Sequence, residues 1–248
     1  MKTLSLLLMM FCCSSAQGAD LTARDVVSQL FATRAQTPID LSGKNFDNLD
    51  LAGVDFKRAN LRGVSFFGTD LTAANLTGCN LEGANLNRAI LTKTNFSNAN
   101  LRSASIRRPS IFANMSSSVA EAPSFQGANL EKAWLEGIFD YTDFSEAHLA
   151  GARFGALNPR DSQGIIMGPR LRSANFVKAD LQAVILERAD LSFANLSGAR
   201  LDGVNLRNAN LSRANFQGAS LRNADLSSTL RDGANWTNAA LPAEDLHR

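Results

Sequence analysis

Large apolar residues recur at every fifth position along most of this chain. From Leu41 to Ile111 all fifteen such positions hold Leu, Phe or Ile, and from Leu171 to Leu241 fourteen of fifteen are apolar. A β-strand alternates its side chains with period two and an α-helix turns once in 3.6 residues, so neither places every fifth residue on one face. The pattern closes only if the chain turns a corner in each unit, which returns each Leu or Phe to the interior.

The rest of each unit fits this geometry. A small residue usually precedes the apolar centre by two positions, Asn or Asp lies between them, and two mostly polar residues follow. Four corners make a square coil of twenty residues, and an echo at that spacing is visible as Asn175, Asn195, Asn215 and Asn235. Stacked coils would share parallel hydrogen bonds at about 4.8 Å, so about nine coils predict a rod of about 45 Å.

At this level of detail the repeats resemble a known family. Units such as Ala74-Asn75-Leu76-Thr77-Gly78 and Ala189-Asp190-Leu191-Ser192-Phe193 match the motif A(D/N)LXX of the pentapeptide-repeat proteins. The resemblance covers residues 39–243. It implies an all-β fold, a right-handed quadrilateral parallel β-helix with Leu, Phe and Ala inside.

Two segments interrupt the repeat, and a one-residue slip precedes Phe139. The interruptions lie near residues 114–122 and 157–168, and both are expected to project from the rod. Projecting loops on a rigid scaffold commonly carry function. Neutral insertions would leave the same pattern, so both interpretations stay open.

Residues 1–18 are predicted to be a signal peptide. Lys2 supplies a short positive start, and Leu4–Cys13 is an apolar run too short to span a bilayer. Cleavage is expected after Ala16 or Gly18, which would make the protein an exported member of its family, periplasmic or secreted. The alternatives are a buried N-terminal helix or strand and a lipid anchor at Cys13.

Both ends of a solenoid need cover, because exposed terminal coils invite stacking. Residues 19–38 are predicted to form a short N-terminal capping helix and a linker. Val26, Val27, Leu30 and Phe31 are expected on the buried face of this helix, and Thr22 with Asp25 resembles a capping box.

The C-terminal end offers less cover, because only a tail of residues 244–248 follows the last repeat. Trp236 and Leu246 could form a homodimer contact through the last coil. Trp236 as the final core filler of a monomer is an equal alternative. Lys44 and Arg231 fall on inward positions of the two terminal coils, where a charged side chain can still reach water.

The chain shows no recognisable catalytic constellation. Its two His residues, His148 and His247, are far apart in sequence, and Cys79 lies in a small-residue position that predicts burial. Motifs for zinc, nucleophile elbows and phosphate loops are absent from the sequence. The Asn and Asp positions suit turn hydrogen bonds better than calcium. We therefore expect no enzyme, cofactor or metal, and a hidden hydrolase in the loops is the least favoured function.

A surface for a partner is the remaining expectation. Arg102, Arg107 and Arg108 form a local basic cluster, although a solvated edge would look the same. Three aromatic residues fall off the core positions and are expected to face outward: Phe67, Phe112 and Phe193. Together these six residues are the predicted interaction surface.

The leading hypothesis is a non-enzymatic, exported scaffold that presents a rigid face to an unknown protein partner. The alternative, implied by the family resemblance, is a cytoplasmic protein that imitates duplex DNA and protects DNA gyrase. A formal net charge of +2, or +1 once Lys2 is lost, argues against an acidic DNA mimic and against a general nucleic-acid footprint. Apart from the short N-terminal run, no segment approaches the length of a membrane span.

Overall fold

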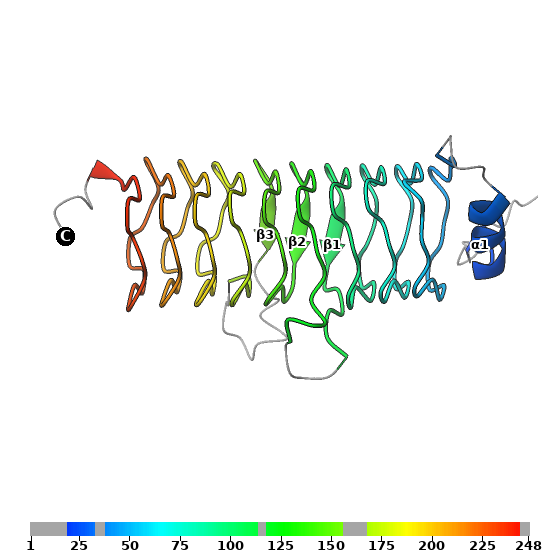
Figure 1. Cartoon of the computed structure of the whole chain (residues 1–248), viewed down its shortest axis with the longest axis horizontal. Coiled ribbons are helices and arrows are strands. Elements are labelled where there is room, and N and C mark those ends of the chain that lie inside the picture. The colour runs from blue at the N-terminus through cyan, green and yellow to red at the C-terminus, as the bar shows by residue number, and fades with distance from the viewer. Residues whose placement is uncertain (1–18, 33–37, 114–117, 156–167, 244–248) are drawn as a thin grey trace, which may run out of the picture.

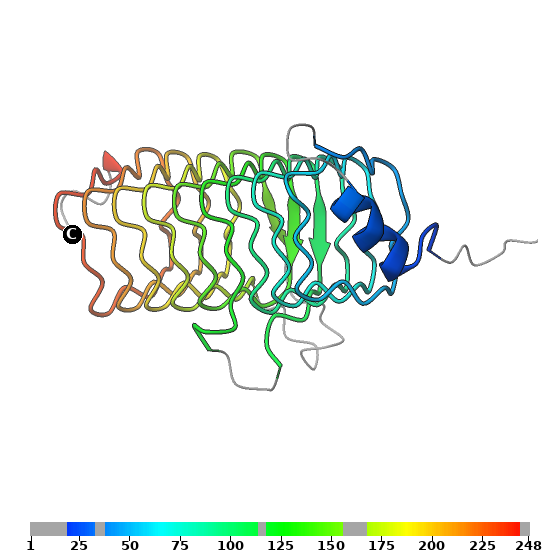
Figure 2. The same ribbon diagram turned by 45° about the vertical axis from the view of Figure 1, so that its right-hand side comes forward.

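The computed structural model describes residues 19–32, 38–113, 118–155 and 168–243. In these ranges the chain winds into a four-sided rod of stacked coils, with helix α1 at one end and the C-terminal residues at the other (Figures 1 and 2). The prediction of a quadrilateral β-helix is confirmed.

Four columns of parallel backbone bridges hold the coils together, one on each side of the rod. The longest has nine bridges between ten residues: Asp40, Asn60, Asn80, Asn100, Asn129, His148, Asp180, Arg200, Ser220 and Ala240. At about 4.8 Å for each step this column is about 43 Å long, in agreement with the length expected from the sequence. The predicted stacking of Asn175, Asn195, Asn215 and Asn235 is also present.

Regular strands occur on one side only of the described part of the rod. Strands β1 (Ser105–Arg107), β2 (Trp134–Glu136) and β3 (Arg153–Gly155) pair in parallel, in the order β1-β2-β3. Ser105 lies opposite Trp134, which lies opposite Arg153. Elsewhere in the coils the bridges are single residues, because the chain bends again within each five-residue unit.

The core is formed by the apolar centres together with the small residues two positions before them. These side chains have relative exposures close to zero throughout the middle of the rod. Four phenylalanines stack in one internal column, with neighbouring ring centroids 4.8–5.2 Å apart: Phe96, Phe125, Phe144 and Phe176. This aromatic column passes through both interrupted coils and keeps them aligned.

The Asn and Asp residues explain how the corners form. The Asn75 Oδ1 atom accepts a hydrogen bond of 3.1 Å from the Thr77 backbone N–H, which fixes the turn after the bridge. The Asn75 side-chain amide also donates to Asp55 on the preceding coil. A positive φ follows at the next corner, where Gly78 has φ +64°. Asn therefore serves both the turn within a coil and the bond between coils.

The number of residues between bridged partners gives the length of both interruptions. Asp55 bridges Asn75 twenty residues later, but Asn95 bridges Ser124, Ser124 bridges Asp143 and Asp143 bridges Asn175. The spacings 29, 19 and 32 mean that the first interruption adds nine residues, one residue is then lost, and the second interruption adds twelve. The lost residue is the slip predicted before Phe139.

The chain has rejoined the coil at Glu121 after the first interruption, and the described chain resumes at Gly168 after the second. The chain rejoins the coil earlier in the sequence than the repeat pattern predicted. Glu121, placed within the first interruption by the repeat pattern, accepts a backbone hydrogen bond of 2.7 Å from Lys93 and so belongs to the coil. Gly168 is buried, and a Cβ there would come within 2.1 Å of the Arg188 carbonyl oxygen, so only glycine fits.

Helix α1 (Ala23–Ala32) begins with the predicted capping box. The Thr22 N–H donates to Asp25 at 3.0 Å and the Asp25 N–H donates to Thr22 at 3.2 Å. The hydrogen bonds from Thr22 lower the pKa of the Asp25 carboxyl group. Val26 and Leu30 are buried in the core cluster.

One expectation for this helix was wrong. Phe31 is 77% exposed, because it lies about 100° around the helix from Leu30 and so falls beside the buried stripe. The Lys57 ammonium covers its ring at 4.8 Å and also donates to the Leu30 carbonyl oxygen at 3.0 Å.

The remaining predictions about buried positions can be compared with the observed exposure of each residue. Cys79 is buried and Lys44 is exposed, as expected. Arg231 is partly buried, and its guanidinium group donates to the Leu226 carbonyl oxygen at 2.9 Å. Trp236 is partly buried and stacks on Phe216 with ring centroids 4.3 Å apart.

Several predictions concern residues outside the described ranges. They are the signal peptide with its cleavage sites and Cys13, the tail with Leu246 and His247, and most of the second interruption. Within the described ranges, no helix combines the length and the hydrophobicity needed to cross a membrane.

Candidate interaction surface

The outside of the rod carries mostly polar ladders, and the ladder on the strand side contains three large side chains on consecutive coils. The column on the strand side reads Asn45, Ser65, Asn85, Ser105, Trp134, Arg153, Ile185, Asn205 and Asp225. Small hydrogen-bonding residues give way there to three large side chains on consecutive coils. We call Lys132, Trp134, Arg153 and Ile185 the Trp134 face.

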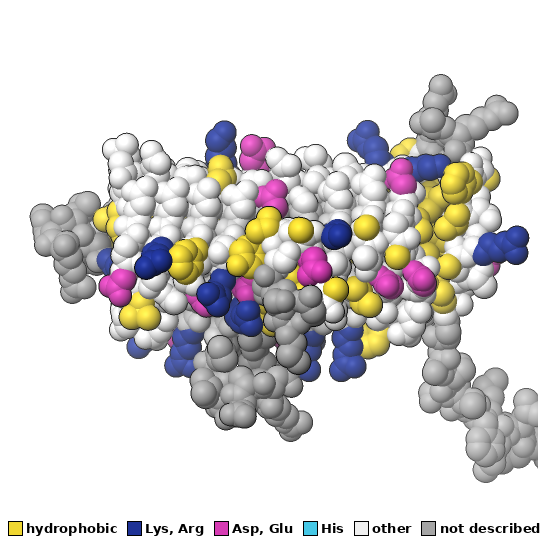
Figure 3. Space-filling view, turned by 60° about the horizontal axis from the view of Figure 1, so that its bottom comes forward, with side chains coloured by type: hydrophobic (Ala, Val, Ile, Leu, Met, Phe, Trp, Pro, Cys, Tyr) yellow, Lys and Arg dark blue, Asp and Glu magenta, His cyan; other side chains and the backbone are white. Residues whose placement is uncertain are grey.

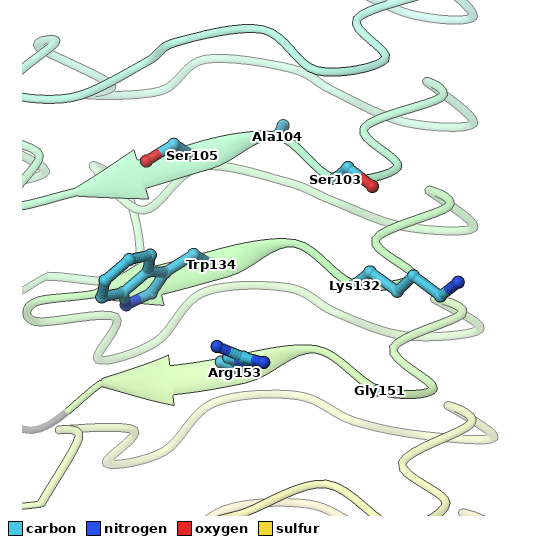
Figure 4. A pocket seen from close by; sticks show the side chains of 7 residues that line it. All are labelled: Ser103, Ala104, Ser105, Lys132, Trp134, Gly151 and Arg153. Carbon is cyan, nitrogen blue, oxygen red and sulfur yellow. The ribbon is translucent and has the colours of Figure 1, made fainter.

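A shallow hollow of about 470 Å³ lies on this face. Small residues on the neighbouring coils line its floor. The longer side chains of Lys132, Trp134 and Arg153 project beside these small residues (Figure 4). Ser103 and Gly151 flank Lys132, one coil before and one coil after it. The hollow exists because three long side chains follow coils whose corresponding residues are short.

The Trp134 ring is exposed but held in place. Its side chain is 42% exposed, and the Arg107 guanidinium group lies 4.3 Å from the ring centroid. Arg107 is itself fixed by an ion pair of 2.8 Å with Glu136. On the next coil a Cβ at Gly155 would come within 3.0 Å of the indole nitrogen, so glycine makes room for the ring. These contacts preorganise an aromatic surface that contributes little to the core.

The predicted basic cluster is present in space but is electrically compensated. Arg102 pairs with Glu131 at 2.9 Å, and Arg107 and Arg108 share Glu136 at 2.8 and 3.2 Å. The Glu136 side chain is only 8% exposed, so two cations are held at one nearly buried carboxylate. The cluster therefore acts first as a clamp between coils.

The predicted aromatic residues do not form one patch. Phe193 is 49% exposed and Phe67 is partly buried, and an arginine of the next coil lies over each ring, Arg213 at 5.4 Å and Arg88 at 5.7 Å. Phe112 was expected to face outward and instead packs partly buried against the core. The Glu121 carbonyl oxygen accepts the hydrogen bond from the Lys93 N–H that the residue at the position of Phe112 would accept in an uninterrupted coil.

The residues of the Trp134 face were missed in the sequence, although a signal was present. Each of Trp134, Arg153 and Ile185 precedes an apolar centre, where Asn, Asp or Ser is usual. Their alignment appears only after the one-residue slip and both insertions are placed, which the bridges do directly. Lys132 and Arg153 form no ion pair with any described residue.

The described residues offer little for catalysis. His148 is exposed on its polar ladder between Asn129 and Asp180. Cys79 lies inside the core, and burial raises the pKa of its thiol to about 12, which keeps it protonated at neutral pH. No group of three His, Cys, Asp or Glu side chains that could hold a metal ion is present in the described ranges.

Comparison with known proteins identifies the repeat. The family model described as pentapeptide repeats matches eight copies, over residues 39–68, 69–108 and 189–228. No curated protein sequence matches the chain.

Solved structures with the same coil are similar along most of the chain. HetL, a pentapeptide repeat protein involved in heterocyst differentiation regulation in the cyanobacterium Nostoc sp. strain PCC 7120, is 25% identical with a TM-score of 0.51. The match covers 90% of this chain and 98% of HetL. QnrB1, a plasmid-mediated fluoroquinolone resistance protein, is 18% identical with a TM-score of 0.29, covering 80% and 89%. A pentapeptide repeat protein of the Arabidopsis thaliana thylakoid lumen is 29% identical with a TM-score of 0.28, covering 59% and 79%.

Proposed function

The chain is a pentapeptide-repeat protein, and we propose that it is a non-enzymatic scaffold that binds a protein partner on the outside of its rigid coil. The observation that carries this proposal is the Trp134 face. Exposed apolar side chains there replace small polar ones on a rod whose fold does not need them.

Three further observations support binding as the task. The described His and Cys residues lie apart, with Cys79 in the core and His148 on the surface. The coil is rigid by construction, because backbone hydrogen bonds run from each coil to the next along its whole described length. HetL, which the chain matches over most of its length, is involved in regulation, a task that binding can perform.

The proposal includes the finer features of the architecture. The coil is right-handed, as the family resemblance implies. Helix α1 serves as the cap of the first coil, a role supported by the burial of Val26 and Leu30 against the core. At the other end, Trp236 and Leu241 are only partly buried and suit contact with a second copy of the chain.

We also propose that the protein works outside the cytoplasm, with residues 1–18 removed as a signal peptide. The test is fractionation of a C-terminally tagged protein, with mass determination of its N-terminus. A periplasmic or secreted chain starting at Gln17 or Ala19 is the expected result. An uncleaved cytoplasmic chain would overturn export and would make DNA gyrase the first partner to assay.

The binding function itself is tested by site-specific crosslinking in cells of the source organism. A photo-crosslinking amino acid is placed at Ile185, on the Trp134 face, and for comparison at Lys178, an exposed residue on another edge of the rod. We expect a discrete protein adduct of defined mass from position 185. The absence of adducts from both positions, and from a third at Phe193, would contradict a protein-binding role.

The distribution of charged side chains bears on the alternative that the protein imitates DNA. Both signs are interspersed on the face of the rod shown in Figure 3, and several arginines pair with carboxylates of neighbouring coils. A DNA mimic needs a continuous acidic surface to replace phosphates. The surface therefore favours a partner other than a DNA-binding enzyme.

A further inference from the structure

We propose that the Trp134 face binds an acidic, extended segment of a partner protein, with apolar side chains about 10 Å apart and a carboxylate near the middle. The inference rests on the proposed binding function and assigns it a surface and a partner chemistry. It is carried by the side chains of Lys132, Trp134, Arg153 and Ile185.

The apolar anchors are the first step. Trp134 is 42% exposed and Ile185 is 56% exposed, in a column whose positions before and after the Trp134 face are polar, from Asn45 to Ser105 and from Asn205 to Asp225. Exposed aromatic and aliphatic side chains at the centre of a flat surface are the usual anchors of protein interfaces. Neither side chain fills the core, since Leu135 and Leu186 occupy the inward positions beside them.

The charge of the face is the second step. Lys132 and Arg153 flank Trp134 and make no ion pair within the described residues, whereas Arg102, Arg107 and Arg200 are each paired with a carboxylate. Two uncompensated cations beside exposed apolar groups favour carboxylates in the bound segment. Arg153 offers a planar group that can bind one carboxylate through two hydrogen bonds.

The spacing is the third step. Trp134, Arg153 and Ile185 lie on three consecutive coils, so two coil steps, about 9.6 Å, separate the two anchors. In a polyproline II segment, residues i and i+3 share a face and are about 9.3 Å apart. An extended segment lying along the rod axis can therefore place one apolar residue on each anchor and a carboxylate beside Arg153.

The backbone excludes one other mode of binding. The Trp134 N–H donates to the Ala104 carbonyl oxygen at 2.9 Å, and the Arg153 N–H donates to Ala133 at 2.8 Å. Both strands are interior to the stack and offer no free edge for an added strand. Recognition must therefore use side chains, and the fixed Trp134 ring lowers the ordering entropy that binding costs.

The test uses Trp134 as its own reporter. The chain has two Trp residues, so Trp236→Phe leaves Trp134 as the only indole. The probes are two capped nonapeptides, three repeats of Leu-Glu-Pro and three repeats of Leu-Lys-Pro, titrated while tryptophan fluorescence is recorded. We expect a saturable change with the acidic peptide and at least tenfold weaker binding of the basic one.

Charge reversal supplies the matched variants. Arg153→Glu and Lys132→Glu should each weaken the acidic peptide about tenfold, and the double variant should bind the basic peptide better than the parent does. Lys178→Glu is the control, because Lys178 is likewise exposed and has nearly the same φ, +57° against +58° for Lys132. Far-ultraviolet circular dichroism confirms that each variant keeps its coil.

Several outcomes overturn the inference. These are equal affinity for both peptides, no saturable change, or unaltered binding in the double variant. Saturable binding of polygalacturonate without binding of the acidic peptide would replace the protein segment by an acidic sugar. Crosslinked adducts that persist after Trp134→Ala combined with Arg153→Glu would refute this surface while leaving the binding function intact.

Discussion

The stability of the interrupted coils should depend on Phe144, because its ring lies in the middle of the aromatic column. Its ring stacks on Phe125 at 5.2 Å and on Phe176 at 5.0 Å, and it also contacts Phe139 and Phe154, both at 6.2 Å. Leucine is the commonest centre in this chain, so Phe144→Leu keeps an apolar filler of accepted shape. Aromatic pairs contribute about 0.5–1.5 kcal/mol each beyond burial. Loss of four such pairs should lower the free energy of unfolding by about 2–6 kcal/mol.

Phe46→Leu is the matched control. Phe46 is equally buried but has one close ring neighbour in the described residues, Phe66 at 5.5 Å. This substitution should cost about 1 kcal/mol. Guanidinium chloride unfolding followed by circular dichroism measures both variants against the parent. Equal losses would refute the reasoning, because they would show that volume and not ring contact sets the stability of the interrupted coils.

Three further predictions follow from the core and its clamp. Leu196→Asp places an uncompensated carboxylate at a fully buried mid-rod centre, so the variant should fail to fold, and a cooperatively melting, β-rich variant would overturn the register. The pKa of Cys79 is raised to about 12 from 9.0, so its thiol stays neutral in the fold but ionises in the unfolded chain above pH 9. The free energy of unfolding should therefore fall between pH 9 and 12, and Cys79→Ala should lessen that fall, as pH-dependent denaturation will show. Glu136→Gln leaves Arg107 and Arg108 without their carboxylate and should lower the free energy of unfolding by about 1–3 kcal/mol. The loss stays in this range because solvent screens both arginines, which are about 40% exposed. An unchanged unfolding midpoint would refute the clamp.

The coil itself could be predicted from the sequence because its determinant is local. Each Leu or Phe must turn inward within its own five residues, so counting positions was sufficient to identify the core, Cys79 included. The echo of Asn175 and Asn195 gave the coil length for the same reason, since identical units fix the same number of corners. Even the one-residue slip before Phe139 appeared as a change of phase.

The contacts between outward side chains could not be predicted in this way. Whether Arg107 meets Glu136 depends on the spacing between coils, which changes from 20 to 29 residues at that point. The expected basic cluster therefore turned out to be compensated, and the alignment of Trp134 with Arg153 and Ile185 was missed. Phe112 was misplaced because the first interruption passes the backbone hydrogen bond of its repeat position to Glu121.

The same irregularities explain why the Trp134 face lies where it does. In the regular coils many outward positions hold an Asn that fixes a turn and bonds to the preceding coil, as Asn75 does. On either side of the first interruption the chain forms strands β1 to β3 instead, and their paired backbones hold the coils at Trp134 and Arg153 without such an Asn. The aromatic column at Phe125 and Phe144 supplies the alignment from inside. Positions 134 and 153 are thereby released from the ladder, so that large and charged side chains can be carried there at little cost to the fold.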